Sequence, residues 1–233
     1  MLGRNHGAIG IAAFGGSVWF GEHTLHLSTL TLAQAALGVV VAAGTALAPD
    51  LDESESLGGR ANPISELPLF GGHRTRTHTL LTAAAVLTIV LLCERNVIAT
   101  AIFVGFMSCM GGSILSSRLR YAGAWLSVPF GVLMGLLSYY SVHAGWWLTA
   151  AVALPYVSHL LADSLTKGGV PLLMPFTKHR FTLGLMRTGR LAEQILTLPI
   201  AAIAAAAGWV AFRPSVVIWL HTLHTAHTAS YLH

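Results

Sequence analysis

Apolar segments of about 20 residues recur along the chain and are its strongest structural constraint. A helix that crosses the hydrocarbon core of a bilayer needs about 20 mostly apolar residues. Only 9% of the 233 residues are charged, whereas soluble domains carry roughly a quarter. We therefore expect an all-α bundle of membrane-embedded helices in a single domain, residues 1–233. The main candidates are 30–48, 79–94, 97–115, 121–142, 146–163 and 191–212.

Two further segments are weaker candidates for membrane helices. Segment 8–20 is short, and segment 214–231 is interrupted by three histidines. We expect about five to seven of these segments to be membrane-embedded helices. We interpret the three histidines as one polar helix face, with an accessory metal site as the alternative: His221, His224 and His227.

The basic residues indicate how the bundle lies in the membrane. Two long polar connections, 49–78 and 164–190, join the apolar segments. If these connections and the N-terminus face the cytoplasm, only Arg95 and Arg213 of the 13 basic residues lie outside. Lys and Arg collect in cytoplasmic loops, so the sequence predicts a multi-pass membrane protein with both polar loops on the cytoplasmic side. The basic residues inside are Arg4, Arg60, Arg74, Arg76, Arg118, Arg120, Lys167, Lys178, Arg180, Arg187 and Arg190.

The positive net charge is explained by the basic residues of the cytoplasmic loops. The chain carries a net charge of +4, but it lacks the interleaved aromatic and basic residues of a nucleic-acid module. We therefore expect no nucleic-acid partner. Cys93 and Cys109 both fall in apolar runs, which favours buried thiols over a disulfide framework.

The first candidate site is the segment PDLD, which follows apolar segment 30–48. If its backbone is extended, Asp50 and Asp52 point in the same direction. Paired carboxylates suit hard or borderline cations such as Mg²⁺, Mn²⁺ and Zn²⁺. The alternative is a solvated acidic helix end.

The segment HLLAD, near the end of apolar segment 146–163, gives a sharper indication. His159 and Asp163 are four residues apart, so they share one face of a helix. Ionisable residues inside a membrane are costly and usually functional. We expect this pair to supply an imidazole and a carboxylate to one ion. The alternative is a polar pair that bonds to neighbouring helices.

The segment HRTRTH lies just before apolar segment 79–94. Its histidines, His73 and His78, are candidate metal ligands. Arg74 and Arg76 between them could instead hold a phosphate. The alternative is a basic loop that contacts anionic lipid. His6 and Glu193 are expected at the same membrane depth, His6 as a further ligand.

These segments together resemble the bacterial inner-membrane metal-dependent hydrolase family typified by YdjM. The resemblance rests on ALAPDLDESES, HRTRTH and HLLADSLTKGGVPLLMPFTKHRFTLGL, which occur in order along most of the chain. It implies a membrane-bound hydrolase. It also implies metal-site roles for Asp50, Asp52, His73, His78, His159 and Asp163.

The resulting hypothesis is a metal-dependent hydrolase that acts at the cytoplasmic membrane face. HLLAD is also similar to the His-x-x-x-Asp pairs of zinc-dependent phospholipase C and the P1-type nucleases, which favours phosphoester chemistry by analogy. We expect one or two divalent ions, Zn²⁺ in preference to Mn²⁺ or Mg²⁺. Arg74 and Arg180, with Arg76 and Lys178, would bind a phosphate. Glu193, or whichever aspartate is not a ligand, would act as the general base.

The expected substrate is an amphiphilic or phosphorylated small molecule, such as a phospholipid or a lipid phosphate. The connection after HLLAD mixes Leu, Met and Phe with Lys, Arg and His, as a surface in contact with membrane lipid would. Two other classes of function remain as alternatives. One is a metal-ion transporter or sensor, and the other is a non-catalytic membrane protein with a structural metal site.

Overall fold

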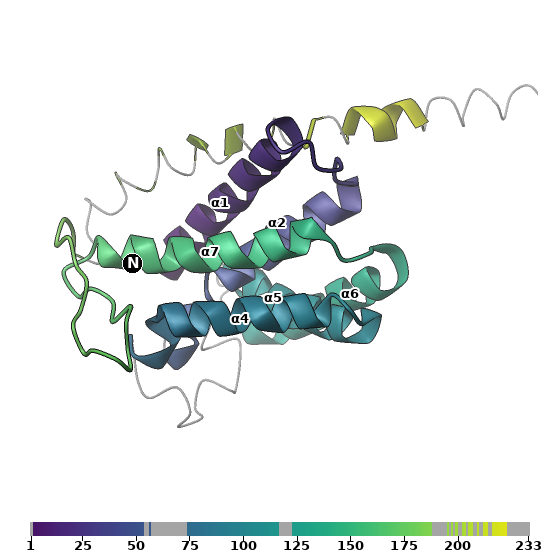
Figure 1. Ribbon diagram of the computed structural model, residues 1–233. Helices are drawn as coiled ribbons and strands as arrows, with labels where there is room; N and C mark the ends of the chain where they lie inside the picture. The colour runs from purple at the N-terminus through teal and green to yellow at the C-terminus, as the bar shows by residue number, and fades with distance from the viewer. Residues whose placement is uncertain are drawn as a thin grey trace, which may run out of the picture.

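Helices make up most of the structure (Figure 1), a computed structural model. It describes residues 2–53, 56, 74–116, 123–187 and 216–222, with scattered positions between 195 and 213. Within these residues the only β-pairing is two isolated bridges, so the expected all-α class is confirmed. The α-helices are α1 (Gly3–His23), α2 (Leu32–Thr45), α4 (Leu80–Cys93), α5 (Val97–Ser116), α6 (Gly123–Ser141) and α7 (Trp146–Ser164). Two 3₁₀ helices accompany them, η1 (Ala48–Asp52) and η4 (Arg76–His78).

The observed helix ends agree with five of the predicted segments to within three residues, but α1 is longer than expected. Segment 8–20 was the prediction, whereas α1 runs from Gly3 to His23. The apolar pattern missed the polar first turn because His6 is buried inside the protein instead of facing solvent. Predicted segment 191–212 and most of 214–231 lie outside the described residues; 216–222 is helical.

One helix in the described part of the chain meets the length and composition expected of a membrane span. It is the window Val97–Ile114 of α5. Helices α2 and α4 are also apolar but have 14 residues each. Large apolar side chains of α5 and α6 nevertheless face outward, including Ile102 and Trp125.

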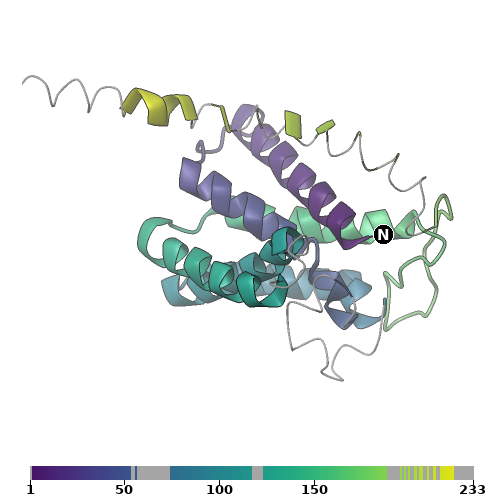
Figure 2. The same cartoon turned by 180° about the vertical axis from the view of Figure 1, so that it is seen from behind.

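The described parts of the two polar connections lie at one end of the bundle (Figures 1 and 2). The N-terminus lies beside the C-terminal part of α7 in both views, next to the loop that follows that helix. The start of α4 joins the same end, because Leu80 N–H donates a hydrogen bond to the Leu172 carbonyl. Gly7 of α1 packs against Ile114 near the end of α5. The chain thus returns to this end repeatedly, so remote polar segments converge there.

Glycines allow α2, α5 and α6 to approach one another closely. A Cβ on Gly44 of α2 would overlap the Met107 carbonyl of α5, and one on Gly111 would lie 2.5 Å from the Val40 oxygen. Such close backbone contact replaces side-chain burial where no water drives helices together.

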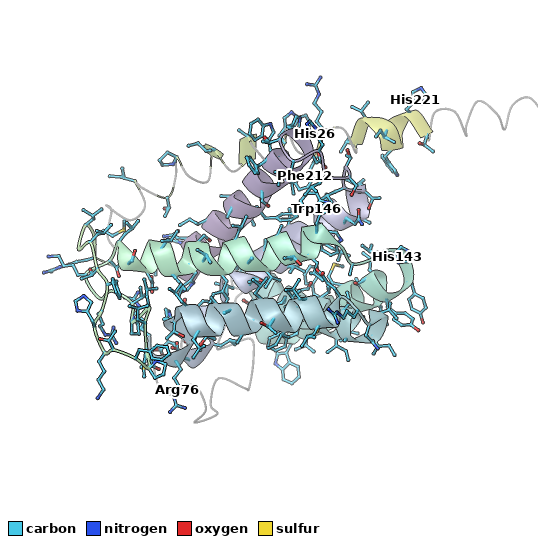
Figure 3. The ribbon with its side chains drawn as sticks, in the orientation of Figure 1. His26, Arg76, His143, Trp146, Phe212 and His221 are labelled. Carbon is cyan, nitrogen blue, oxygen red and sulfur yellow. The ribbon has the colours of Figure 1, made fainter. Side chains whose placement is uncertain are left out.

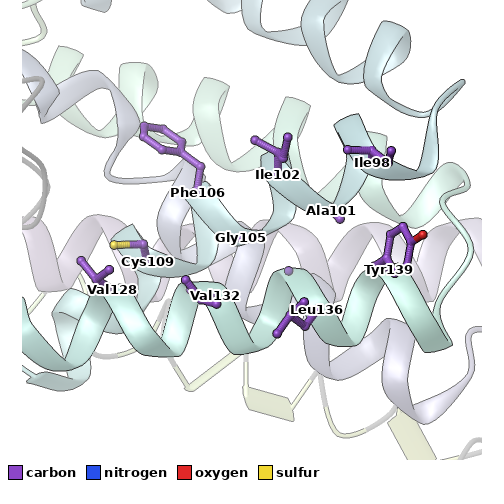
Figure 4. Close-up of a pocket in the computed structure, with 12 residues that line it drawn as sticks. Ile98, Ala101, Ile102, Gly105, Phe106, Cys109, Val128, Val132, Leu136 and Tyr139 are labelled. Atoms are coloured by element: carbon purple, nitrogen blue, oxygen red, sulfur yellow. The ribbon is translucent and has the colours of Figure 1, made fainter.

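The contact between α5 and α6 leaves an apolar groove of about 420 Å³ on its outer side (Figure 4). Its walls include Phe106, Val132 and Leu136, and its floor includes Gly105. No Asp, Glu or His lines this groove, and its titratable side chains are Cys109 and Tyr139.

We expect substitution of Gly44 by alanine to destabilise the protein by about 1–3 kcal/mol, because α2 and α5 must separate. Gly16→Ala is the matched control, since a Cβ there meets no atom within 4 Å. Thermal unfolding in detergent compares the two variants. Equal unfolding temperatures for both would contradict the close α2–α5 contact.

Candidate metal centre

Five buried side chains from four parts of the chain form a polar cluster at the end of the bundle where the loops meet. His6 comes from the first turn of α1, Asp50 from η1 and His78 from η4, while His159 and Asp163 lie on the last turns of α7. The three imidazoles are at most 1% exposed, Asp163 is fully buried, and Asp50 is 6% exposed. We call these five residues the polar cluster.

The possible ligand atoms of the polar cluster lie close together. His78 Nε2 is 3.2 Å from His159 Nε2, and each of these nitrogens is 3.6 Å from Asp50 Oδ1. Asp163 Oδ2 lies 3.7 Å from His78 Nε2 and 3.9 Å from His159 Nε2. The two nitrogens and two oxygens thus surround one small volume, as the sequence predicted for HLLAD and for Asp50.

Helix α7 brings His159 and Asp163 to this volume together, because residues four apart lie on the same helix face. The His159 ring is oriented by its other nitrogen, Nδ1, which lies 2.7 Å from the Ala46 carbonyl oxygen at the end of α2. A carbonyl only accepts hydrogen bonds, so Nδ1 carries the proton and the neutral ring presents an Nε2 lone pair to the polar cluster.

His78 is oriented in a similar way by Thr77 and Asp52. The Thr77 hydroxyl donates to Asp52 Oδ2 at 2.6 Å, and the Thr77 oxygen lies 3.0 Å from His78 Nδ1. Because that hydroxyl proton is already donated, His78 Nδ1–H is the donor in the second contact. The His78 Nε2 lone pair therefore also faces the polar cluster. Asp52 Oδ2 is 3.4 Å from His78 Nδ1, on the edge of the ring that faces away from the polar cluster.

The backbone of PDLD differs from the expectation. It is the 3₁₀ helix η1 instead of an extended segment, with Pro49 in its first turn, where a proline ring suits helical φ and no N–H is needed. The carboxylates of Asp50 and Asp52 therefore do not point the same way. Asp50 lies near the Nε2 atoms of His78 and His159. Asp52 instead lies near Nδ1 of His78 and orients that ring.

His6 adds a third imidazole to the polar cluster. Its ring stacks on that of His159 with centroids 3.7 Å apart, and its Nε2 is 3.2 Å from Asp163 Oδ1. One nitrogen of His6, one nitrogen of His159 and one Asp50 oxygen also lie within 4.8 Å of one another. The expected proximity of His6 to the other ligands is thus observed.

The two arginines expected to bind a phosphate have different surroundings. Arg74 Nε forms an ion pair with Asp163 Oδ2 at 2.8 Å, and Arg74 Nη1 donates to the Thr166 hydroxyl. Arg180 is exposed, and its guanidinium donates to the carbonyls of Gly168 and Arg74. Arg74 therefore supports Asp163, while Arg180 lies at the surface beside it.

The charges around His78 and Asp50 shift their pKa values in opposite directions. Burial raises the pKa of Asp50, but His159, His78 and His6 together lower it to well below its usual value. Burial lowers the pKa of His78, but the carboxylates of Asp50 and Asp52 raise it above its usual value. Both shifts show that the site favours positive charge between these carboxylates.

The donor atoms fit a divalent cation. Zinc bound to nitrogen and oxygen at about 2.0–2.1 Å in a tetrahedron has ligand atoms roughly 3.3 Å apart. The separation of the two imidazole nitrogens and the four nitrogen–oxygen separations lie between 3.2 and 3.9 Å. A mixed imidazole and carboxylate set suits Zn²⁺ or Mn²⁺ better than a purely hard ion. His78, His159, Asp50 and Asp163 could therefore hold a metal ion, with His6 as a further donor.

Two predicted site residues, His73 and Glu193, lie outside the described residues. Sequence reasoning in turn missed Thr77 and the Ala46 carbonyl, which orient the two histidines. The position of Thr77, directly before His78 in HRTRTH, was the available signal. Nothing in the sequence pattern pointed to a backbone carbonyl.

We expect Asp52→Asn to weaken metal binding by about 10- to 100-fold, the usual effect of losing a residue that orients a ligand. His159→Ala, which removes a donor, should abolish binding. Glu94→Gln is the matched control because Glu94 bonds to Thr149, away from the polar cluster. Metal content and calorimetric titration with Zn²⁺ measure these effects. Complete loss of metal in Asp52→Asn would contradict an orienting role.

Comparison with known proteins identifies the family of the chain. Residues 1–230 match the model of a family described as YdjM inner membrane protein. No curated protein and no solved structure matches the chain. The match covers almost the whole sequence and includes every residue of the polar cluster. The chain therefore belongs to the YdjM inner membrane protein family.

Proposed function

We propose that the protein is a membrane-embedded metal-dependent hydrolase that acts on a phosphoester, such as a phospholipid or lipid phosphate, at the cytoplasmic face. The observation that carries this proposal is the convergence of His78 Nε2, His159 Nε2, Asp50 Oδ1 and Asp163 Oδ2 on one buried volume. Mixed histidine and aspartate ligands are typical of catalytic zinc sites, whereas structural sites favour thiolates.

The chain's own residues have distinct roles in this proposal. His78, His159, Asp50 and Asp163 hold the ion. A bound divalent cation supplies positive charge that acidifies water and polarises the ester. His6, whose Nε2 is 3.2 Å from Asp163 Oδ1, is a further ligand of the ion. Glu193, or an aspartate that does not hold the ion, acts as the general base.

The least buried edge of the site supports a phosphate-bearing substrate. The side chains of Asp50 and Arg74 are 8% and 11% exposed, while the other side chains of the polar cluster are fully buried. The exposed Arg180 lies beside Arg74 through its bond to the Arg74 carbonyl. A substrate that enters at this edge would meet a guanidinium, which suits a phosphate.

The membrane arrangement is also part of the proposal. The cluster, the N-terminus and the loop after α7 share one end of the bundle, and Arg76 lies at that end in Figure 3, whereas His143 lies toward the other. Together with the basic residues of the polar loops, this favours a multi-pass protein in the inner membrane with the metal site facing the cytoplasm.

Cysteine labelling tests this topology. In a background with Cys93 and Cys109 replaced by alanine, we expect His179→Cys to react with an impermeant maleimide only in inverted vesicles. His143→Cys should react only in intact cells, because both side chains are exposed at opposite ends of the bundle. Labelling of both cysteines from the same side would contradict the topology.

Metal-dependent hydrolysis tests the activity. We expect the zinc-loaded protein to hydrolyse a member of a panel of phospholipids, lipid phosphates and generic phosphodiesters. Asp163→Asn should reduce that activity to background, because a ligand and the partner of Arg74 and His6 are lost together. Arg180→Gln should raise KM by roughly tenfold or more, the effect of losing one charged hydrogen bond to a phosphate.

The control for the arginine variant is Arg95→Gln, which lies just after α4, away from the site. Two results would overturn the proposal. Bound metal without hydrolysis of any substrate would favour a structural ion. Metal-dependent uptake of zinc into vesicles, again without hydrolysis, would favour a transporter.

A further inference from the structure

The 165–187 loop, which follows α7, is an ordered structure without helix. Two isolated bridges hold it together, Thr166 with Met186 and Val170 with Phe181. Hydrogen bonds join Leu183 N–H to the Ser164 carbonyl and Leu185 N–H to the Leu165 carbonyl. The loop is therefore folded back on the end of α7.

This loop exposes large apolar side chains. Phe176 is 88% exposed, Leu183 and Leu185 are each 67% exposed, and Leu173 is 43% exposed. Full exposure of a Phe to water is unfavourable by about 1.5–3 kcal/mol relative to burial. Four such side chains on one short loop mark an interaction surface.

The same loop carries only positive charge. No Asp or Glu occurs anywhere between residues 164 and 190. The exposed basic side chains of the loop are Lys167, Lys178, His179, Arg180 and Arg187. A partner for this surface must therefore combine negative charge with a place for apolar side chains.

The loop is continuous with the apolar outer surface of the helix ends. Leu80 N–H at the start of α4 donates to Leu172 in the loop. Leu80 and Leu81 of α4 are 47% and 57% exposed, and Leu161 of α7 is 59% exposed. In an inner membrane protein these leucines face lipid, so the loop lies where the hydrocarbon region meets the headgroups.

We propose that the 165–187 loop docks on anionic phospholipid headgroups of the membrane in which the helices lie. Phe176, Leu173, Leu183 and Leu185 insert among the headgroups, as apolar residues of interfacial segments do. Lys167, Lys178 and Arg187 bind the phosphates. This docking depends on the membrane location alone and holds whether or not the metal site is hydrolytic.

Docking would also fix the loop beside the metal site. The Arg180 guanidinium donates to the Arg74 carbonyl, and Arg74 forms the ion pair with Asp163. The loop that binds headgroups thus also contacts Arg74, the ion-pair partner of the proposed metal ligand Asp163. A lipid headgroup held by the loop lies near the least buried edge of the polar cluster.

The test uses the full-length protein in nanodiscs of phosphatidylcholine with or without phosphatidylglycerol. A polarity-sensitive fluorophore is attached to Phe176→Cys in the background that lacks Cys93 and Cys109. We expect blue-shifted emission that is quenched by spin-labelled lipid headgroups, with a larger shift when phosphatidylglycerol is present. Tyr140→Cys is the control, because Tyr140 is 78% exposed at the other end of the bundle and should not respond to phosphatidylglycerol.

A charge variant tests the role of the basic side chains. Lys167→Gln, Lys178→Gln and Arg187→Gln together should weaken phosphatidylglycerol binding on the order of a hundredfold, since each surface cation contributes roughly fivefold. Binding is measured by native mass spectrometry, and metal content of the same samples reports that the fold is intact. Water-like emission at position 176 in both nanodiscs would overturn the proposal. So would unchanged lipid binding by the triple variant, or preferential binding of a short RNA over phosphatidylglycerol.

Discussion

Two imidazole lone pairs that face each other inside the protein are the constraint on which the rest of the structure depends. His78 Nε2 and His159 Nε2 are 3.2 Å apart, and each Nδ1 is already a donor elsewhere. Two lone pairs at this distance repel each other, and Asp50 Oδ1 adds negative charge 3.6 Å from both. A proton or a cation between them turns this repulsion into attraction. Without such a positive charge, holding η1 and η4 against α7 would bury these groups uncompensated, which is energetically costly.

The sequence predicted the parts of the site that depend on local geometry. The spacing of His159 and Asp163 fixes them on one helix face whatever surrounds the helix. The clustering of basic residues in the polar connections predicted that remote segments would meet at one end of the bundle, and they do. The length and bounds of the apolar segments likewise predicted most helix bounds.

Features that depend on tertiary contacts could not be predicted in this way. Whether PDLD is extended or helical depends on what Asp52 meets, and it meets Thr77, 25 residues away. Arg74 has a backbone in the left-handed region, with φ of 55°, and turns its guanidinium to Asp163 instead of to solvent. An arginine next to a histidine in sequence therefore predicts positive charge near the site, but it does not predict which group the guanidinium contacts.

Arg74 links the polar cluster to the 165–187 loop, which explains why this loop includes residues that support Asp163 as well as exposed apolar and basic ones. Its Nε forms an ion pair with Asp163, and its Nη1 donates a hydrogen bond to the Thr166 hydroxyl. Its backbone carbonyl accepts a hydrogen bond from Arg180. A Cβ on Gly168 would overlap the Arg74 guanidinium, so the glycine there makes room for it. Moving the loop would therefore move the group that neutralises Asp163. A buried carboxylate that loses this partner keeps a negative charge that nothing compensates, so the position of the loop would change how strongly the polar cluster attracts a cation.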